Sequence, residues 1–551
     1  MVVQWRGRQR IEWGLIAVLW LSLARSSAVA ADRLPGLKDP SYWIQLCTLL
    51  STTKPAEALV ACERAIELRP GDAQLWARYG ALQLGLKQYP DAIASLDQAL
   101  KRQPKNAQVL TDQCLAWTAL NRKELALAAC DKALQVNANW GDRSAVVAHH
   151  ARSVILNQPD VYEAAIKVYE SVLQQTPNDS LALFYRGEAL VKVGQLPVAI
   201  AMFDRALQGN GNWGPEAPLQ VWYARGTAHR LLGQLELAVQ SFDRALQLDP
   251  NHAPSWLQQG HSLRQLKRPS EALIAYNRAV ELEPKSAQAL LGQCIVLNQV
   301  QQAEAALAAC QKAIQGDGDW SAADLAQAWN QQSQALATQG KLEDALAAAN
   351  RAVAMRSDWG EAWSDRAVVL WYLKRYEEAL ASVQKAVTLN PEDARAWANQ
   401  GRILRSLNQP EKALAAYTEA TNRNPQDAIT WANQSVVQWT LGNFDAALET
   451  ANRSLAVNLK LVQGWQNRAV ALVALKKYPE AQSSYEQAIV LDKTNAEAWA
   501  GLGLVLAQRQ QYPKAIQALQ TALSLNPQNP LAQRALQALT EAQPPAAPGL
   551  R

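Results

Sequence analysis

The chain has 551 residues, with 54 lysines and arginines against 49 acidic residues and a formal net charge of +5. Residues 1–30 hold four arginines and one glutamate, so the rest of the chain carries only +2; this argues against nucleic acid as the main partner, because such binding depends on clustered cations. No glycine-rich phosphate loop, nucleophile elbow or metal motif is present, so we expect no enzyme, no cofactor and no metal site.

The N-terminal thirty residues have the pattern of a secretory signal. Three arginines at positions 6, 8 and 10 precede an apolar run from 14 to 24 and then the small-x-small sequence Ala28-Val29-Ala30. A bilayer-spanning helix needs about 20 apolar residues, so this run predicts a signal over 1–30 and a short linker over 31–39. We expect the periplasm, a thylakoid lumen or the extracellular space, with no membrane insertion after cleavage; an uncleaved anchor is the alternative.

From residue 40 onward, one alanine column recurs at intervals of only 34 or 39 residues. A fixed period of this length predicts one helical hairpin repeated in a stack, with each hairpin needing a neighbour on both sides. The column consists of Ala58, Ala92, Ala126, Ala165, Ala199, Ala238, Ala272, Ala306, Ala345, Ala379, Ala413, Ala447, Ala481 and Ala515.

Further columns keep a set distance from this alanine. A small residue stands twelve positions before it, as at Gly226 and Gly401, and a tryptophan often stands sixteen positions before it, as at Trp397. Small residues let two helices approach closely, and the large apolar ring fills the space between neighbouring hairpins. A proline such as Pro425 ends the second helix of eight repeats, because it cannot continue the hydrogen-bond ladder.

These columns resemble the tetratricopeptide repeat family, whose pattern is matched well by residues 394–427 with Trp397, Gly401, Ala413, Tyr417 and Pro425. The resemblance covers about residues 40–529. It implies an all-α, right-handed α-solenoid (a superhelix) of about fourteen hairpins, whose concave face is lined by the first helix of each pair and usually binds peptides or protein segments. Residues 530–543 are expected to form a capping helix, and residues 544–551 a disordered tail.

The six cysteines fall into three pairs with separations of 15, 16 and 16 residues, each pair inside one repeat. One member takes the small-residue column and the other lies four residues after the marker alanine, where the two helices are closest. A disulfide needs this close approach, so we expect three bonds within repeats. Buried free cysteines are the alternative. The expected pairs are Cys47–Cys62, Cys114–Cys130 and Cys294–Cys310.

Four repeats end in Asn-Trp or Asp-Trp instead of proline. These tryptophans are either hydrophobic plugs over the next helix or an aromatic rim for stacking on sugars or peptides. The first three are followed by the five-residue insertions 141–145, 214–218 and 321–325, which produce the 39-residue intervals. The four are Trp140, Trp213, Trp320 and Trp359.

Two residues after the tryptophan column, Asn399, Asn433 and Asn467 follow one another at intervals of 34, with Gln331 and Asp365 in the same column upstream. An asparagine amide can donate to and accept from a peptide backbone, so this ladder could hold an extended segment. A solvated polar face is the alternative. Further candidates on the same helices, for charged or stacking contacts, are Arg402, Arg405, Trp371, Tyr372 and Trp439.

The favoured function is an exported, non-enzymatic scaffold that binds extended segments of partner proteins in its groove. The alternatives are an assembly or biogenesis factor for an envelope or membrane complex, and a carbohydrate- or cell-wall-binding protein. The five histidines, which include the neighbours His149 and His150, are expected to be packing or surface residues. The sequence names neither the partner nor the oligomeric state.

Overall fold

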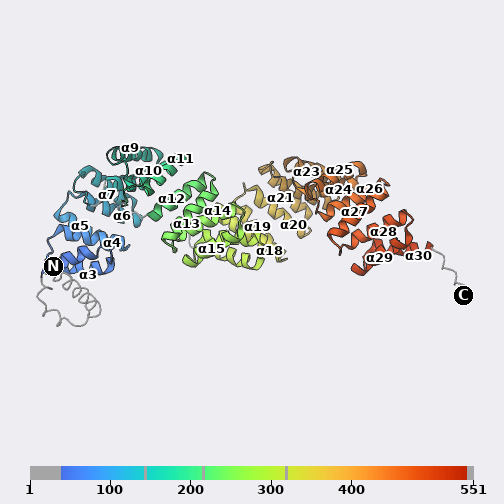
Figure 1. Cartoon of the computed structure of the whole chain (residues 1–551), viewed down its shortest axis with the longest axis horizontal. Coiled ribbons are helices and arrows are strands. Elements are labelled where there is room, and N and C mark those ends of the chain that lie inside the picture. Colours follow the sequence, from blue (N-terminus) through green and yellow to red (C-terminus); the bar gives the residue numbers. More distant parts are fainter. Residues whose placement is uncertain (1–38, 142–144, 212, 214–217, 317–320, 543–551) are drawn as a thin grey trace, which may run out of the picture. The chain divides into compact units, whose positions relative to one another are not determined.

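The computed structural model describes residues 39–141, 145–211, 213, 218–316 and 321–542. Within them the chain forms 29 helices, α2 to α30, and no strands (Figure 1). No helix in these ranges is both long and apolar enough to cross a bilayer. The predicted signal, nearly all of the linker, the tail, Trp320 and most of the first two insertions lie outside the described residues.

The chain divides into two compact units, residues 1–268 and 269–551. Unit 1 contains α2 (Pro40–Leu50), α3 (Pro55–Leu68), α4 (Ala73–Gly85), α5 (Tyr89–Arg102), α6 (Ala107–Ala119), α7 (Lys123–Val136), α8 (Ala145–Leu156), α9 (Pro159–Gln175), α10 (Ser180–Lys192), α11 (Leu196–Leu207), α12 (Pro218–Leu231), α13 (Leu235–Leu248) and α14 (Ala253–Gln265).

Unit 2 contains α15 (Pro269–Leu282), α16 (Ala287–Gln299), α17 (Ala303–Gln315), α18 (Ala322–Thr338), α19 (Leu342–Met355), α20 (Gly360–Tyr372), α21 (Tyr376–Leu389), α22 (Ala394–Ser406), α23 (Pro410–Arg423), α24 (Ala428–Thr440), α25 (Phe444–Val457), α26 (Val462–Ala474), α27 (Tyr478–Leu491), α28 (Ala496–Gln508), α29 (Tyr512–Leu525) and α30 (Pro530–Ala542). Even-numbered helices up to α28 are the first helices of the repeats, and α30 packs on α28 and α29 as a final single helix.

Local sequence accounts for where the helices begin and end. Asp393 caps α22 by accepting hydrogen bonds from the backbone N–H groups of Arg395 and Ala396, and Asp427 caps α24 in the same way. Many second helices begin with a proline in the first turn, where its missing N–H costs nothing. Between the two helices of a hairpin one residue takes a left-handed conformation, for example Asn408 with φ 56°. The predicted alternation of helix and tight turn is therefore confirmed.

The alanine column is the centre of each hairpin, and its members are at most 3% exposed. Beside it, the small-residue column brings the backbones together. A Cβ added to Gly226 would lie 2.6 Å from the ring of Phe242, and one on Gly401 would lie 2.8 Å from the ring of Tyr417. These positions therefore admit only the smallest side chains, as expected from the repeat pattern.

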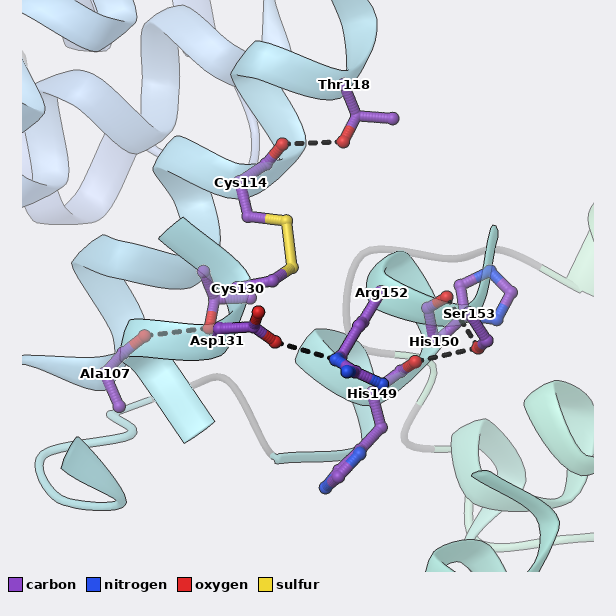
Figure 2. The surroundings of a disulfide bond; sticks show 10 residues. Ala107, Cys114, Thr118, Cys130, Asp131, His149, His150, Arg152 and Ser153 are labelled. Carbon is purple, nitrogen blue, oxygen red and sulfur yellow. Dashed lines mark hydrogen bonds and ion pairs between the residues drawn. A yellow bond between two sulfur atoms is a disulfide. The ribbon is translucent and has the colours of Figure 1, made fainter. Parts of the chain in front are cut away.

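The cysteine pairs occupy the small-residue column and the position four residues after the marker alanine, and they are bonded as expected. Their Cα atoms lie 5.0, 5.3 and 5.2 Å apart for Cys47–Cys62, Cys114–Cys130 and Cys294–Cys310, and every cysteine is fully buried. Figure 2 shows Cys114 on α6 joined to Cys130 on α7, with Arg152 of α8 directed at Asp131 of α7. Each cross-link thus connects the two helices of one hairpin.

The tryptophan column fastens the turn between consecutive repeats. Trp397 Nε1 donates a hydrogen bond of 2.8 Å to the carbonyl oxygen of Pro391, six residues earlier, and the Arg423 guanidinium lies 5.2 Å from the Trp397 ring centroid. The same bond over six residues is made by Trp76, Trp256, Trp363, Trp431, Trp465 and Trp499. Trp363 and Trp397 also pack on the cores of adjacent hairpins, so their role is structural.

Candidate functional site

The predicted peptide ladder lies along the first helices of unit 2, and its side chains bond to neighbouring helices. Asn399 on α22 is only 6% exposed, and its Nδ2 donates to Ser364 Oγ on α20 at 3.1 Å. Asn467 Nδ2 on α26 donates to the carbonyl oxygen of Ala432 on α24 at 2.8 Å. The column therefore connects successive first helices across the repeat boundary.

Asp365 and Gln331 take part in the same kind of bonding upstream. Asp365 Oδ2 accepts hydrogen bonds from Asn330 at 2.7 Å and Gln334 at 2.8 Å, both on α18, and its Oδ1 lies 3.2 Å from an Arg395 nitrogen on α22. Gln331 accepts from the amide of Asn298 on α16 through both its side-chain and its backbone oxygen. Asp365 is 8% exposed, so it stabilises the stack and does not face a ligand.

The expectation that the whole column presents amides to a peptide needs correction at Asn399 and Asp365. Adjacent first helices pack closely enough for a short side chain at this position to reach the next helix, and the bond it makes there removes its polar atoms from solvent. Asn433 is half-buried and accepts from Gln463 at 3.3 Å, and Asn467 is also half-buried. Only these last two asparagines keep polar surface for a ligand.

The other candidates are aromatic and cationic residues on successive first helices, and we call them together the Trp–Arg patch: Trp371, Tyr372, Arg402, Arg405 and Trp439. Trp371 and Tyr372 meet edge to face, with ring centroids 5.1 Å apart, and the Arg402 guanidinium lies 5.4 Å from the Trp371 centroid. Tyr372 is 53% exposed and Trp439 43% exposed, and Arg405 is exposed too. The patch spans the first helices α20, α22 and α24.

The side chains beneath the patch are packed without a cavity. The space between Val368, Trp371, Asn399, Arg402 and Ile403 leaves no room for a water molecule. Trp371 is held in place because its Nε1 donates to Ser406 Oγ at 2.8 Å. The patch is therefore a preorganised surface and not a cavity.

The charge of the patch is not neutralised locally. Within the described ranges neither Arg402 nor Arg405 pairs with a carboxylate, whereas Arg395, also on α22, lies 3.2 Å from Asp365. Burial raises the pKa of the Tyr417 hydroxyl beneath them, and the positive charges of Arg405 and Arg402 act in the opposite direction. The patch thus combines two unpaired guanidinium groups with exposed aromatic rings.

Sequence reasoning missed a groove in unit 1. It has a volume of about 560 Å³ and follows α4, flanked by the end of α2, the start of α6 and the turn after α7. We call it the α4 groove. The only sequence signal was Arg78, which takes the same column as the asparagines, two residues after Trp76. Its polar lining includes Gln74, Arg78, Gln103, Asn106, Gln108 and Asn139.

The tryptophans of the variant turns that fall in described parts of the chain are packed. Trp213 contacts the large core cluster around α10, and Trp140 contacts the cluster of α6 and α7, where its Nε1 donates to Asn137 at 3.1 Å. Trp359 packs beside Val353 and lies under the Arg356 guanidinium. These contacts fit the plug interpretation. The third insertion, which is described in full, lengthens the start of α18 to a 17-residue helix.

The adjacent histidines have different surroundings, as expected for neighbours on a helix. The His150 ring stacks on the Tyr185 ring with centroids 3.9 Å apart, and its Nε2 lies 3.5 Å from a Glu188 oxygen. Burial lowers the pKa of His150 to about 4. Figure 2 shows the His149 and His150 side chains pointing in different directions from α8. In the part of the chain that the structure describes, no cluster of His, Cys, Asp or Glu has the arrangement of a metal site.

Several solved structures are similar to this chain, each at low identity. A crystal structure of the APC/C hetero-tetramer Cut9–Hcn1 shares 14% identity over 91% of this chain and 96% of that one, with a TM-score of 0.42. A tetratricopeptide repeat protein from Parabacteroides merdae shares 16% over 47% and 99%, with a TM-score of 0.39. YrrB, a TPR protein, shares 20% over 34% and 97%, with a TM-score of 0.30.

Comparison with curated protein sequences gave no match. Family models described as tetratricopeptide repeat match residues 49–111, 160–212, 219–252, 257–323, 330–395, 364–420, 398–458 and 467–530. These segments cover well over half of the residues and coincide with the helical hairpins. The chain belongs to the tetratricopeptide repeat family.

Proposed function

We propose that this protein is a non-enzymatic scaffold, working outside the cytoplasm, that binds an extended segment of a partner protein across the Trp–Arg patch. Proteins of this family bind protein partners and are generally not enzymes, which supports an interaction scaffold. The observation that carries the finer proposal is the patch itself, which combines exposed Tyr372 and Trp439 with Arg402 and Arg405, neither of which pairs with a carboxylate among the described residues.

The composition of the patch fits a binding hot spot. Tryptophan, tyrosine and arginine are the residues that most often dominate interface energies, because they bury large areas and still offer hydrogen bonds. Trp371 and Arg402 are already ordered by Ser406 and by each other, so little side-chain entropy is lost on binding. The half-buried Asn433 and Asn467 lie along the same wall and could bond to the backbone of a bound segment.

The disulfides support the proposed location. Three fully buried disulfides, each within one repeat, are typical of proteins that fold in an oxidising compartment, since such bonds are rare in the cytosol. The predicted signal at residues 1–30 agrees with this compartment. A role in assembling an envelope complex would be a more specific form of this function, and it would use the same surface.

The test is a peptide-library selection on the purified full-length chain, followed by fluorescence anisotropy with the selected peptide. Trp439→Ala and Arg405→Glu should each weaken binding at least about tenfold, because hot-spot truncations commonly cost 2 kcal/mol or more. Tyr512→Ala on α29 and Arg534→Glu on α30 are matched exposed controls and should bind as the wild type does.

Two outcomes would reject the proposal. One is equal affinity of the patch variants and the wild type for every selected peptide. The other is an absence of peptide binding together with a glycan-array signal, which would favour the carbohydrate-binding alternative. Circular dichroism of each variant establishes that its helices are intact.

A further inference from the structure

We propose that a pocket beside Gln400, on the side of α22 away from the Trp–Arg patch, binds one neutral sugar ring. We call it the Gln400 pocket. It has a volume of about 250 Å³. Sites for drug-sized ligands usually measure roughly 300–1,000 Å³, so this pocket is large enough for a single small ring and too small for a peptide segment. The site is separate from the patch and goes beyond the protein-binding function.

The pocket lies between two successive second helices of unit 2. Leu380 comes from α21, Gln400 and Leu404 come from α22, and Ala415 comes from α23. Arg402 of the patch follows Gln400 by two residues, which is about 200° around a helix, so it is directed to the other side of α22. Every residue that lines the pocket lies in a described range, between positions 380 and 419.

In several other repeats the position of Gln400 bonds the first helix to the second helix of the preceding repeat. Gln434 Nε2 on α24, for example, donates to Thr418 Oγ1 on α23 at 3.0 Å, sixteen residues earlier. The residue sixteen positions before Gln400 is Gln384, which is exposed and lines the pocket, and no hydrogen bond joins these two described residues. The pocket therefore lies where this bond between repeats is missing. The same bond is made by Gln259 to Asp243 and by Arg468 to Asn452.

The amides around the pocket are not engaged elsewhere. The side-chain oxygens of Gln400 and Gln409 are shielded from bulk solvent and accept no hydrogen bond from a described residue. Buried amide oxygens are normally paired, so these two call for a partner. Because no bond within the described chain fixes either side chain, each can turn its amide towards a bound molecule.

The rest of the lining decides what kind of molecule fits. Leu380, Leu404 and Ala415 present apolar surface, so the ligand needs an apolar face. The two charged lining residues, Lys412 and Glu419, have opposite signs, which favours a neutral ligand. A sugar ring has an apolar C–H face and hydroxyl groups that both donate and accept, so it satisfies the amides in either orientation.

Saturation-transfer difference NMR with the full-length chain tests the ligand class, because it detects binding as weak as millimolar. The probes are glucose, galactose, mannose and N-acetylglucosamine. Two comparison compounds are cyclohexanol, which has a ring and one hydroxyl, and sorbitol, which has the hydroxyls and no ring. At least one sugar should show transfer, and neither comparison compound should. Transfer to none of the sugars, or equal transfer to either comparison compound, would overturn the proposal.

Variants then assign the site. Ala415→Trp fills the pocket from an exposed position and should abolish the sugar signal. Gln400→Leu removes the amide and should weaken binding about three- to tenfold, the change expected from one hydrogen bond. The matched controls are Ala381→Trp, at the same position one repeat earlier, and Gln332→Leu, at the position of Gln400 on α18; both lie outside the pocket and should bind as the wild type does. Wild-type affinity in either pocket variant, with its helices intact by circular dichroism, would contradict the assignment.

The outcome is separable from that of the Trp–Arg patch. Trp439→Ala should keep the sugar signal, and Ala415→Trp should keep binding of the selected peptide. Loss of the sugar signal in Trp439→Ala would place the sugar on the patch and would reject the Gln400 pocket as its site.

Discussion

Removing the cross-link between Cys114 and Cys130 should loosen one hairpin and leave distant hairpins unchanged. The bond closes a loop with a sequence separation of 16 residues between α6 and α7, and both cysteines are fully buried. Chain-entropy arguments give about 3 kcal/mol for a loop of this size. In a repeat protein this free energy acts mainly on the hairpin that contains the bond and on its neighbours.

Native-state hydrogen exchange, read by mass spectrometry, measures this loss locally. In the double variant Cys114→Ala, Cys130→Ala, protected amides of α6 and α7 should exchange roughly a hundredfold faster, since about 1.4 kcal/mol corresponds to a factor of ten. Amides of α28 and α29 should keep their wild-type rates. Wild-type protein refolded under reducing conditions should behave like the variant at these two helices, which separates the cross-link from the side chains.

The reasoning would be refuted by either of two results. Exchange in α6 and α7 that changes less than about threefold would show that close packing alone holds the hairpin. An equal acceleration in α28 and α29 would show that the bond acts on the whole chain, and the repeat-by-repeat account of stability would be wrong.

Three further changes test the packing. Trp397→Phe removes the indole bond to Pro391 and should cost about 1 kcal/mol, measured by urea unfolding. Gly401→Ala places a methyl group 2.8 Å from the ring of Tyr417 and should cost about 1–3 kcal/mol in the same assay. Burial lowers the pKa of His150 to about 4 from 6.5, so as the pH falls the imidazole is protonated in the unfolded chain before it is protonated in the folded chain. The free energy of unfolding should therefore drop by up to about 3 kcal/mol between pH 6.5 and 4, and the drop should be smaller in His150→Phe.

Matched positions serve as controls for these changes. Gly71→Ala adds a methyl group with no atom within 4 Å and should alter stability by less than about 0.5 kcal/mol. Trp439→Phe changes a ring that is 43% exposed and makes no hydrogen bond to a described residue, so it should be similarly mild. If the controls cost as much as Trp397→Phe and Gly401→Ala, the column positions have no special role.

The repeat pattern predicted most of the fold because its constraints are local and recur at a fixed period. Ala413 must be small where two helices meet, Gly401 must admit the Tyr417 ring, and a cysteine pair can replace this contact only where the backbones are already close. Each requirement involves residues within one hairpin, about 16 positions apart. Such relations can be read from a single sequence once the period is known.

The functional surface was harder to predict because it depends on contacts between repeats. The period places Asn399 and Asn433 in one column, but it does not say that Asn399 reaches Ser364 on the preceding first helix and becomes buried. The group that lies opposite on the preceding first helix decides this: it is Ser364 for Asn399 and the Ala432 carbonyl for Asn467. The α4 groove was missed for a related reason: Asn139, in its lining, comes from a turn that departs from the repeat pattern.

The most direct test of the central claim is site-specific photo-crosslinking in the native host. The full-length chain would carry p-benzoylphenylalanine at Trp439 in the patch or, as the control, at Tyr512 on α29, and cross-linked peptides would be identified by mass spectrometry. The account predicts that the patch position captures one defined segment of one partner protein and that the control position does not. Capture of the same proteins from both positions, or of none from the patch, would contradict it.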